Sequence, residues 1–180
     1  MGPQSMFRGA RVSREQIVKE RERLAIPSVV GLLLTLLSAP AVLAQSCEGK
    51  WQKAALTIYT SYPEPGSEEC IDYNGCEWAG QFYGLPEPQT REWVAAHNIA
   101  AVHEKDWASL GMQTLQLRQD KRQIEVQVID ICADADCNGC CTQNLGGDGF
   151  LIDLESATMD RFGSGDGVVE FRVCTASSGG

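Results

Sequence analysis

The 180-residue sequence lacks internal repeats and coiled-coil heptads, and it has few basic residues beyond its first 44 positions. Those positions hold six of the 15 Lys and Arg residues and three of the 24 Asp and Glu residues, which leaves nine basic and 21 acidic residues, a formal net charge of −12. Such a charge repels phosphate backbones and anionic lipid. We therefore expect no nucleic-acid partner and favour a neutral or cationic ligand.

The first 44 residues have the layout of a signal peptide. Basic residues, the last of them Arg23, precede an uncharged run over 25–44 that ends in the small residue Ala44. We expect cleavage between Ala44 and Gln45, a secreted (periplasmic or extracellular) protein, and no stable membrane association afterwards. Two alternatives stay open. In the first, the segment is not cleaved and anchors the chain in a membrane, because the run is about as long as a bilayer-spanning helix, on the order of 20 residues. In the second, Cys47 carries a lipid.

All the cysteines lie beyond the expected cleavage site, in the part of the chain that meets an oxidising compartment. An even number of cysteines in a short secreted domain predicts disulfides, up to four here. The sequence does not fix the pairing, although Cys174 is expected to tether the last strand to an earlier strand. The cysteines expected in disulfides are Cys47, Cys70, Cys76, Cys132, Cys137, Cys140, Cys141 and Cys174.

The cysteine-rich loop has two alternative interpretations as a metal site. Cys137 and Cys140 form a Cys-x2-Cys pair of the kind that holds zinc. Residues 134–139 match the first six positions of a calcium loop, but its twelfth position is Leu145 and not a bidentate Glu. Because disulfides fit a secreted chain with an even cysteine count, we expect neither a metal nor a cofactor.

Short alternating strands dominate the rest of the chain. The clearest pattern is a β-hairpin over 113–130, with Leu115, Leu117, Ile124, Val126 and Val128 facing inward. The expected strands are 54–62, 99–103, 113–119, 123–130 and 168–174, and the expected helices are 90–97, capped by Thr90, and 154–162, ended by Gly163. This spacing predicts a closed barrel or sandwich.

Four motifs between residues 99 and 174 follow one another in a particular order. A hydrophobic strand ends in Asp130-Ile131-Cys132, a cysteine-rich loop follows, Ile152-Asp153-Leu154-Glu155 precedes a short helix, and a Gly-rich turn leads to the closing strand. This order resembles the double-psi β-barrel of the barwin, expansin and RlpA-like proteins, which is related to family-45 endoglucanases. Leu110 stands where the family has a cysteine, so the disulfide pattern must differ.

The resemblance implies a mainly β fold, a six-stranded double-psi β-barrel with short helices and a disulfide-rich loop. It places this domain at residues 45–174 and leaves 175–180 as a disordered tail. The resemblance is good over 99–174, loose over 54–62, and fails over 63–88.

The resemblance also marks Asp153 and Asp130 as candidate catalytic residues. It equates Asp153 with the general acid of the endoglucanases, which expansins also need, and it places Asp130 on the same groove floor. Structural roles are the alternative. Asp153 would cap the following helix, a position that favours the charged carboxylate and opposes the raised pKa of a general acid. Asp130 would anchor the cysteine loop by accepting backbone N–H bonds.

A second acid for hydrolysis is missing from the first expected strand. Glycoside hydrolysis ordinarily needs two carboxyl groups, and no acid lies between Lys53 and Pro63. The pair is incomplete unless an acid enters from the following loop, where the candidates are Glu68, Glu69 and Asp72. His97 and His103 are interpreted as structural.

Aromatic residues are the expected contacts to a sugar, because their faces stack on pyranose C–H groups. The irregular segment over 64–88 is a candidate binding loop. The expected substrate-binding residues are Tyr59, Tyr62, Tyr73, Trp78 and Tyr83. Trp93 and Trp107 flank regular elements and are expected in the core.

These features favour a secreted, monomeric, expansin-like module that binds, and by the resemblance loosens, extracellular polysaccharide (glucan or peptidoglycan) without hydrolysis. The first alternative is a lytic transglycosylase or endoglucanase that uses Asp153 as general acid. The second is a barwin-like secreted effector that binds a protein.

Overall fold

The computed structural model describes residues 45–73, 75–145, 147 and 149–176. The expected signal peptide, 1–44, lies outside the described residues, as do the last four residues of the expected tail. None of the helices in the described ranges is long and apolar enough to cross a membrane. The last strand continues to Ala176, so the first two residues of the expected tail belong to that strand.

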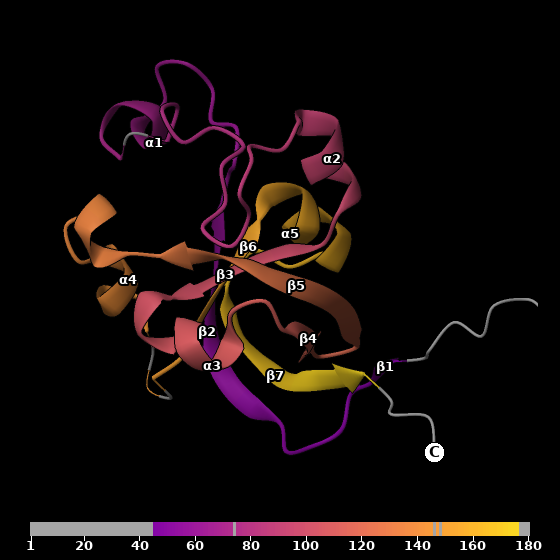
Figure 1. Ribbon diagram of the computed structural model, residues 1–180. Helices are drawn as coiled ribbons and strands as arrows, with labels where there is room; N and C mark the ends of the chain where they lie inside the picture. The colour runs from indigo at the N-terminus through magenta and orange to yellow at the C-terminus, as the bar shows by residue number, and fades with distance from the viewer. Residues whose placement is uncertain (1–44, 74, 146, 148, 177–180) are drawn as a thin grey trace, which may run out of the picture. The chain divides into compact units, whose positions relative to one another are not determined.

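Strands form most of the regular structure (Figure 1). They are β1 (Gln45–Ser46), β2 (Gln52–Tyr59), β3 (Ile99–His103), β4 (Thr114–Gln119), β5 (Arg122–Cys132), β6 (Leu151–Glu155) and β7 (Gly167–Ala176). The short helices are α1 (Glu68–Ile71), α2 (Arg91–Ala96), α3 (Trp107–Leu110), α4 (Cys140–Gln143) and α5 (Ser156–Phe162), with 3-10 turns η1 (Glu104–Asp106) and η2 (Asp134–Asp136).

Six strands, β2 to β7, close into a barrel. Their order is β7-β2-β6-β3-β5-β4, and β4 pairs with β7 to complete the circle. Two neighbouring pairs are parallel, β2 with β6 and β3 with β5, and the other pairs are antiparallel. Two-residue β1 adds only to the end of β7. The predicted six-stranded, mainly β barrel is thereby confirmed.

The barrel interior is filled by the alternate residues that the sequence pattern placed there. Leu115, Leu117, Val126 and Val128 of the hairpin are almost fully buried, as are Val169 and Phe171 of β7. The predicted hairpin therefore has the right register and the right inward face. Ile124, the fifth predicted inward residue, is partly buried and packs against the same core.

A second apolar cluster joins the segment before β3 to the outside of the barrel. Phe82, Val94, Ile99 and Ile129 are buried there, and Trp93 packs against them. The predicted helix α2 contributes Val94, and its Thr90 cap accepts the Trp93 N–H at 3.2 Å, as expected. Trp107, in turn, packs against the barrel core. Both tryptophans are only partly buried.

The second predicted helix begins later than expected, because residues 151–155 form strand β6. β6 pairs with β2 on one side and β3 on the other, and its Leu154 is fully buried in the barrel. Pairing on both edges outweighs the helical pattern of these few residues. Helix α5 starts at Ser156, with Glu155 as its N-cap, and ends at Gly163 in the left-handed conformation, as predicted.

Four disulfides use all eight cysteines. The pairs are Cys47–Cys174, Cys70–Cys76, Cys132–Cys141 and Cys137–Cys140. Cys174 ties β7 to Cys47, which directly follows β1 and is not itself in a strand. The sulfur atoms of the Cys-x2-Cys pair bond to each other, so they are not the free thiolates that the alternative zinc site requires.

Candidate functional site

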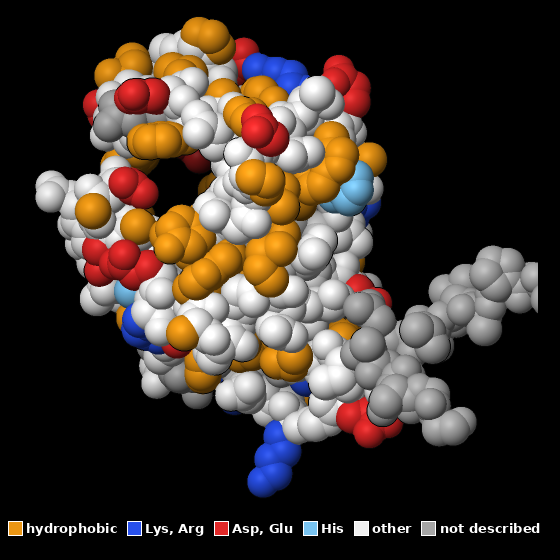
Figure 2. Space-filling model, in the orientation of Figure 1, with side chains coloured by type: hydrophobic (Ala, Val, Ile, Leu, Met, Phe, Trp, Pro, Cys, Tyr) orange, Lys and Arg blue, Asp and Glu red, His pale blue; other side chains and the backbone are white. Residues whose placement is uncertain are grey.

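A groove of about 640 Å³ lies on the outside of the barrel wall. Its floor is formed by the facing parts of β2, β3, β5 and β6. One wall is the segment over 60–81, which carries α1, and the other is the cysteine-rich loop over 132–144, which carries η2 and α4. In Figure 2 an opening is visible between these two walls, bordered by apolar and acidic side chains.

A single row of residues crosses the floor from β2 to β5. Thr57 on β2 is in register with Asp153 on β6, Asp153 with Ala101 on β3, and Ala101 with Asp130 on β5. The small side chain of Ala101 leaves space between the two aspartates. Because they are two strands apart, their backbones are separated by roughly 10 Å. The two predicted catalytic residues thus share one floor.

A β-bulge places Asp130 in this row. The pairing of β3 with β5 shifts between Ala100 and Ala101, so that Ala100 pairs with Val128 and Ala101 with Asp130. Strict alternation from inward-facing Val128 would turn Asp130 toward the barrel core, but the extra residue at the bulge, Ile129, lets Asp130 face outward. The bulge therefore moves a carboxyl group from the apolar side of the wall to the groove.

Asp153 has a pKa close to neutral pH, so that it changes charge there. Burial raises its pKa from 3.8 to about 7, and the charges of Glu69 and Asp130 add to the rise, whereas the hydrogen bond from Thr57 Oγ1 to Oδ1, at 2.6 Å, opposes it. The alternative role of Asp153 as a helix cap is wrong, because Glu155 is the cap and accepts the Ala157 N–H at 2.7 Å. The expected obstacle to a raised pKa is thereby removed.

Asp130 accepts backbone N–H bonds, as its alternative structural role predicts, and it also lines the groove. Its Oδ1 accepts the backbone N–H groups of Tyr83 at 3.1 Å and Ile131 at 3.0 Å, so it does anchor local backbone. Burial nevertheless raises its pKa to about 6, and these two bonds oppose the rise. Asp130 therefore lines the groove as an acid that changes charge slightly below neutral pH.

Three of the five predicted aromatic residues line the groove: Tyr59 in the floor, and Tyr73 and Trp78 in the α1 wall, where they are 40% and 55% exposed. Tyr62 lies elsewhere, with its hydroxyl donating to the Gln89 carbonyl. Tyr83 lies outside the groove too, 63% exposed and edge-on against Trp107.

Tyr59 brings a polar group into the floor. Its hydroxyl is buried near Asp130 and Ser61 and makes no hydrogen bond of ordinary geometry with the described residues. Burial, with the charges of Asp130 and Asp153, raises the pKa of Tyr59 well above its usual value. The phenol thus stays neutral.

The sequence offered three loop acids as the missing second carboxyl group, and Glu69 is the one that a hydrogen bond holds in the groove. Glu68 and Glu69 both line the groove, whereas Asp72 does not. Glu69 Oε1 accepts the Thr60 N–H at 3.1 Å, which fixes the carboxylate beside the end of β2. The sequence named these acids but gave no sign of which one turns inward, because that depends on the disulfide-closed path of the loop.

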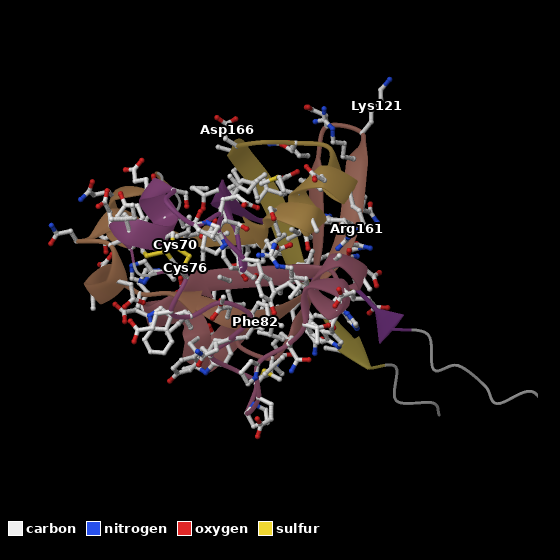
Figure 3. The ribbon with its side chains drawn as sticks, turned by 90° about the horizontal axis from the view of Figure 1, so that it is seen from above. Cys70, Cys76, Phe82, Lys121, Arg161 and Asp166 are labelled. Atoms are coloured by element: carbon white, nitrogen blue, oxygen red, sulfur yellow. A yellow bond between two sulfur atoms is a disulfide. The ribbon has the colours of Figure 1, made fainter. Side chains whose placement is uncertain are left out.

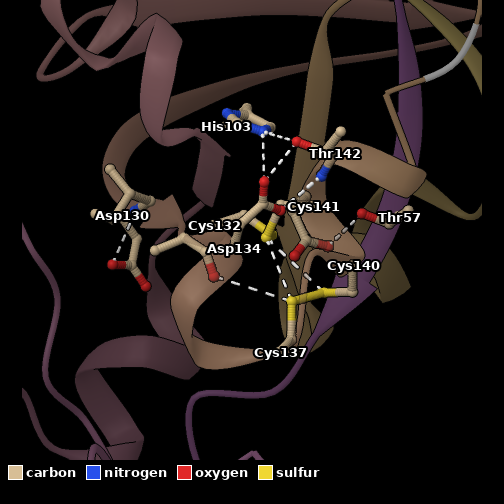
Figure 4. The surroundings of a disulfide bond; sticks show 12 residues. Thr57, His103, Asp130, Cys132, Asp134, Cys137, Cys140, Cys141 and Thr142 are labelled. Carbon is tan, nitrogen blue, oxygen red and sulfur yellow. Dashed lines mark hydrogen bonds and ion pairs between the residues drawn. A yellow bond between two sulfur atoms is a disulfide. The ribbon is translucent and has the colours of Figure 1, made fainter.

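The cysteine-rich loop, which forms the opposite wall of the groove, is held by disulfides and hydrogen bonds (Figure 4). Cys132–Cys141 and Cys137–Cys140 close the loop. The Asp134 carboxylate accepts the Thr142 N–H at 2.8 Å and its hydroxyl at 2.5 Å. Buried His103 contacts the same threonine at 3.0 Å. This network gives His103 the structural role expected of it.

The groove is acidic. Asp130, Asp136, Asp153, Glu68 and Glu69 line it, and no Lys or Arg is found among its lining residues in the described ranges. This distribution agrees with the preference for a neutral or cationic ligand inferred from the net charge.

Comparison with known proteins gives similarity at the level of solved structures. No family model matches the sequence, and no curated protein matches it significantly. An expansin from Clavibacter michiganensis is 15% identical, with a TM-score of 0.43 over 72% of this chain and 53% of the expansin, so the chain spans about half the length of that protein.

Two further solved structures are similar to the chain. The β-1,4-D-endoglucanase Cel45A from the blue mussel Mytilus edulis is 15% identical, with a TM-score of 0.43 over 72% of this chain and 86% of that enzyme. A Streptomyces papain inhibitor is 16% identical, with a TM-score of 0.37 over 68% of this chain and 94% of the inhibitor. The strand order and the two parallel pairs, β2 with β6 and β3 with β5, assign the chain to the double-psi β-barrel fold.

Proposed function

We propose that the chain is a secreted, expansin-like module that binds and loosens cell-wall polysaccharide, glucan or peptidoglycan, in the groove without hydrolysis. The observation that carries this proposal is the combination of exposed Tyr73 and Trp78 on the wall with Asp153 and Asp130 on the floor. Aromatic faces fit the C–H faces of sugar rings, a protonated Asp153 donates a hydrogen bond to a sugar hydroxyl, and an ionised Asp130 accepts one. The volume of the groove, about 640 Å³, is typical of ligand sites.

Replacing Trp78 with Ala is expected to weaken binding to insoluble polysaccharide by roughly 3- to 10-fold, because one aromatic contact contributes about 0.5 to 1.5 kcal/mol. Depletion isotherms on cellulose, chitin and peptidoglycan measure this affinity. Tyr83→Ala is the matched control, because Tyr83 is a similarly exposed ring outside the groove. Equal losses in the two variants would contradict a binding site in the groove.

A second candidate function is cleavage of the polysaccharide, favoured by the raised pKa of Asp153. At a pKa of about 7 the carboxyl retains a proton that it can give to a glycosidic oxygen. The bond from C1 to that oxygen then breaks, and its electron pair goes to the protonated leaving group. C1 bonds either to a hydroxyl of the same sugar, as in a lytic transglycosylase, or to water. The attacking hydroxyl or water loses its proton to a carboxylate of the groove.

The two candidates differ in sugar release. If the chain cleaves polysaccharide, Asp153→Asn should reduce soluble sugar release by about 100-fold or more, because a general acid contributes roughly 10²–10⁴-fold. Incubation with the three polymers, measuring both pull-down and release, distinguishes the functions. Pull-down without release supports the expansin-like module. If neither occurs, both carbohydrate functions are wrong, and the barwin-like alternative gains weight.

A further inference from the structure

Glu69 lies in the part of the chain where the resemblance to known families fails, yet its carboxylate reaches the same groove as Asp153. It is partly buried in the α1 wall, and the Thr60 N–H donates to its Oε1 at 3.1 Å. Thr60 directly follows β2, the strand that carries Thr57. The carboxylate of Glu69 is thus bonded to the residue that follows β2, and the hydroxyl of Thr57, within β2, is bonded to Asp153.

The backbone of Glu69 is fixed as well. The Gly75 N–H donates to the Glu69 carbonyl at 2.8 Å, and the disulfide Cys70–Cys76 starts at the next residue. Ser67 caps α1 through the Cys70 N–H at 3.2 Å. Figure 3 shows this disulfide beside α1. A disulfide that closes so short a loop keeps Glu69 near one position, even though much of the surrounding segment is exposed.

A fixed negative charge in a partly buried groove acts on its neighbours. Burial is the largest cause of the raised pKa of Asp153, and the Thr57 hydrogen bond opposes it; the charge of Glu69 is a smaller contribution that raises this pKa further. The buried Tyr59 hydroxyl, which makes no hydrogen bond of ordinary geometry within the described residues, lies in the same floor. The donor that lines the groove is therefore the protonated carboxyl of Asp153.

We propose that Glu69 is a positioning residue whose fixed carboxylate holds a proton on Asp153, so that Asp153 meets the polysaccharide as a hydrogen-bond and proton donor. The role of Asp153 as a donor to polysaccharide rests on the proposed function. The coupling between the two carboxyl groups is a property of the protein by itself and is tested without polysaccharide.

The test is a ¹³C NMR titration of the Asp153 carboxyl in the purified, disulfide-bonded chain. Glu69→Gln removes the charge but keeps an acceptor for the Thr60 N–H, and it should lower the pKa of Asp153 by roughly half a unit or more. Glu68→Gln is the matched control, since Glu68 is the preceding residue and also lines the groove. It should leave the pKa of Asp153 unchanged within about 0.2 units.

Two further variants separate charge from structure. Glu69→Asp keeps the charge and should retain most of the raised pKa of Asp153. Cys70→Ser with Cys76→Ser releases the loop and should lower this pKa, as Glu69→Gln does. An unchanged pKa in a folded Glu69→Gln protein, or an equal fall in Glu68→Gln, would overturn the proposal. A chain that binds no polysaccharide but shows the fall would lack the proposed function and keep the coupling.

Discussion

Asp153→Asn is expected to make the protein more stable at pH 8 and to leave its stability at pH 4 almost unchanged. In the folded protein the pKa of Asp153 is about 7, against an ordinary value of 3.8. Between these two values the folded chain binds more protons than the unfolded chain, so stability falls as the pH rises from about 4 to 7. Asn cannot ionise, and it still offers an oxygen to the Thr57 hydroxyl. The stability of the variant should therefore not show this decrease as the pH rises.

The size of the effect follows from the difference between the two pKa values, which corresponds to about 4 kcal/mol. Water in the groove screens the partly buried carboxyl, so we expect about half of this as a gain in unfolding free energy at pH 8. Urea unfolding at pH 4 and pH 8 measures it. Asp160→Asn, at an exposed position on α5, is the control and should change neither value.

This result would bear on function as well as stability. A buried acid that costs stability at neutral pH is retained in a protein when the site needs it. If Asp153→Asn proves less stable at pH 8 than the native chain, the carboxyl has a structural role after all, and its assignment as a proton donor is wrong.

Removing the disulfide Cys47–Cys174 is expected to produce the largest loss of stability. The two cysteines are 127 residues apart in sequence, and the chain-entropy relation assigns about 5 kcal/mol to a loop of this length. Cys47→Ser with Cys174→Ala should therefore lower the unfolding free energy by several kcal/mol. Urea denaturation under non-reducing conditions measures the change.

The matched control is the disulfide Cys137–Cys140, whose cysteines are only three residues apart. The same relation assigns it about 1.5 kcal/mol. Replacing both of its cysteines with Ser should consequently cost much less than opening the long loop. Similar losses for the two pairs would mean that local packing, and not closure of the chain, determines their contributions.

Local patterns predicted much of the barrel. Strict alternation gave the hairpin its register, since one face of each strand is buried, and Thr90 correctly marked the start of α2. The same reasoning failed at residues 151–155, where a few residues before a helix carry no pattern strong enough to show a strand. Only the pairing of β6 with β2 and β3 decides the conformation there.

For the candidate site too, the sequence predicted some of the residues, and the tertiary structure decided their environment. The resemblance identified Asp153 and Asp130, but their environment, including the loss of the helix-cap role and the rise in the pKa of Asp153, depends on strands far apart in the sequence. The aromatic residues were chosen by type alone. Tyr73 and Trp78 reach the groove, while Tyr83 packs against Trp107, because the loop path between them is set by the tertiary fold.

The sequence by itself determined the mainly β class, the inward face of the hairpin, the acidic charge and an even set of cysteines, because each depends on residue type and on neighbours a few positions away. Tertiary structure decided the disulfide pairs, the bulge that turns Asp130 into the groove and the position of Glu69 in the groove that Asp153 lines. These depend on contacts between distant segments, whose geometry emerges only when the barrel closes.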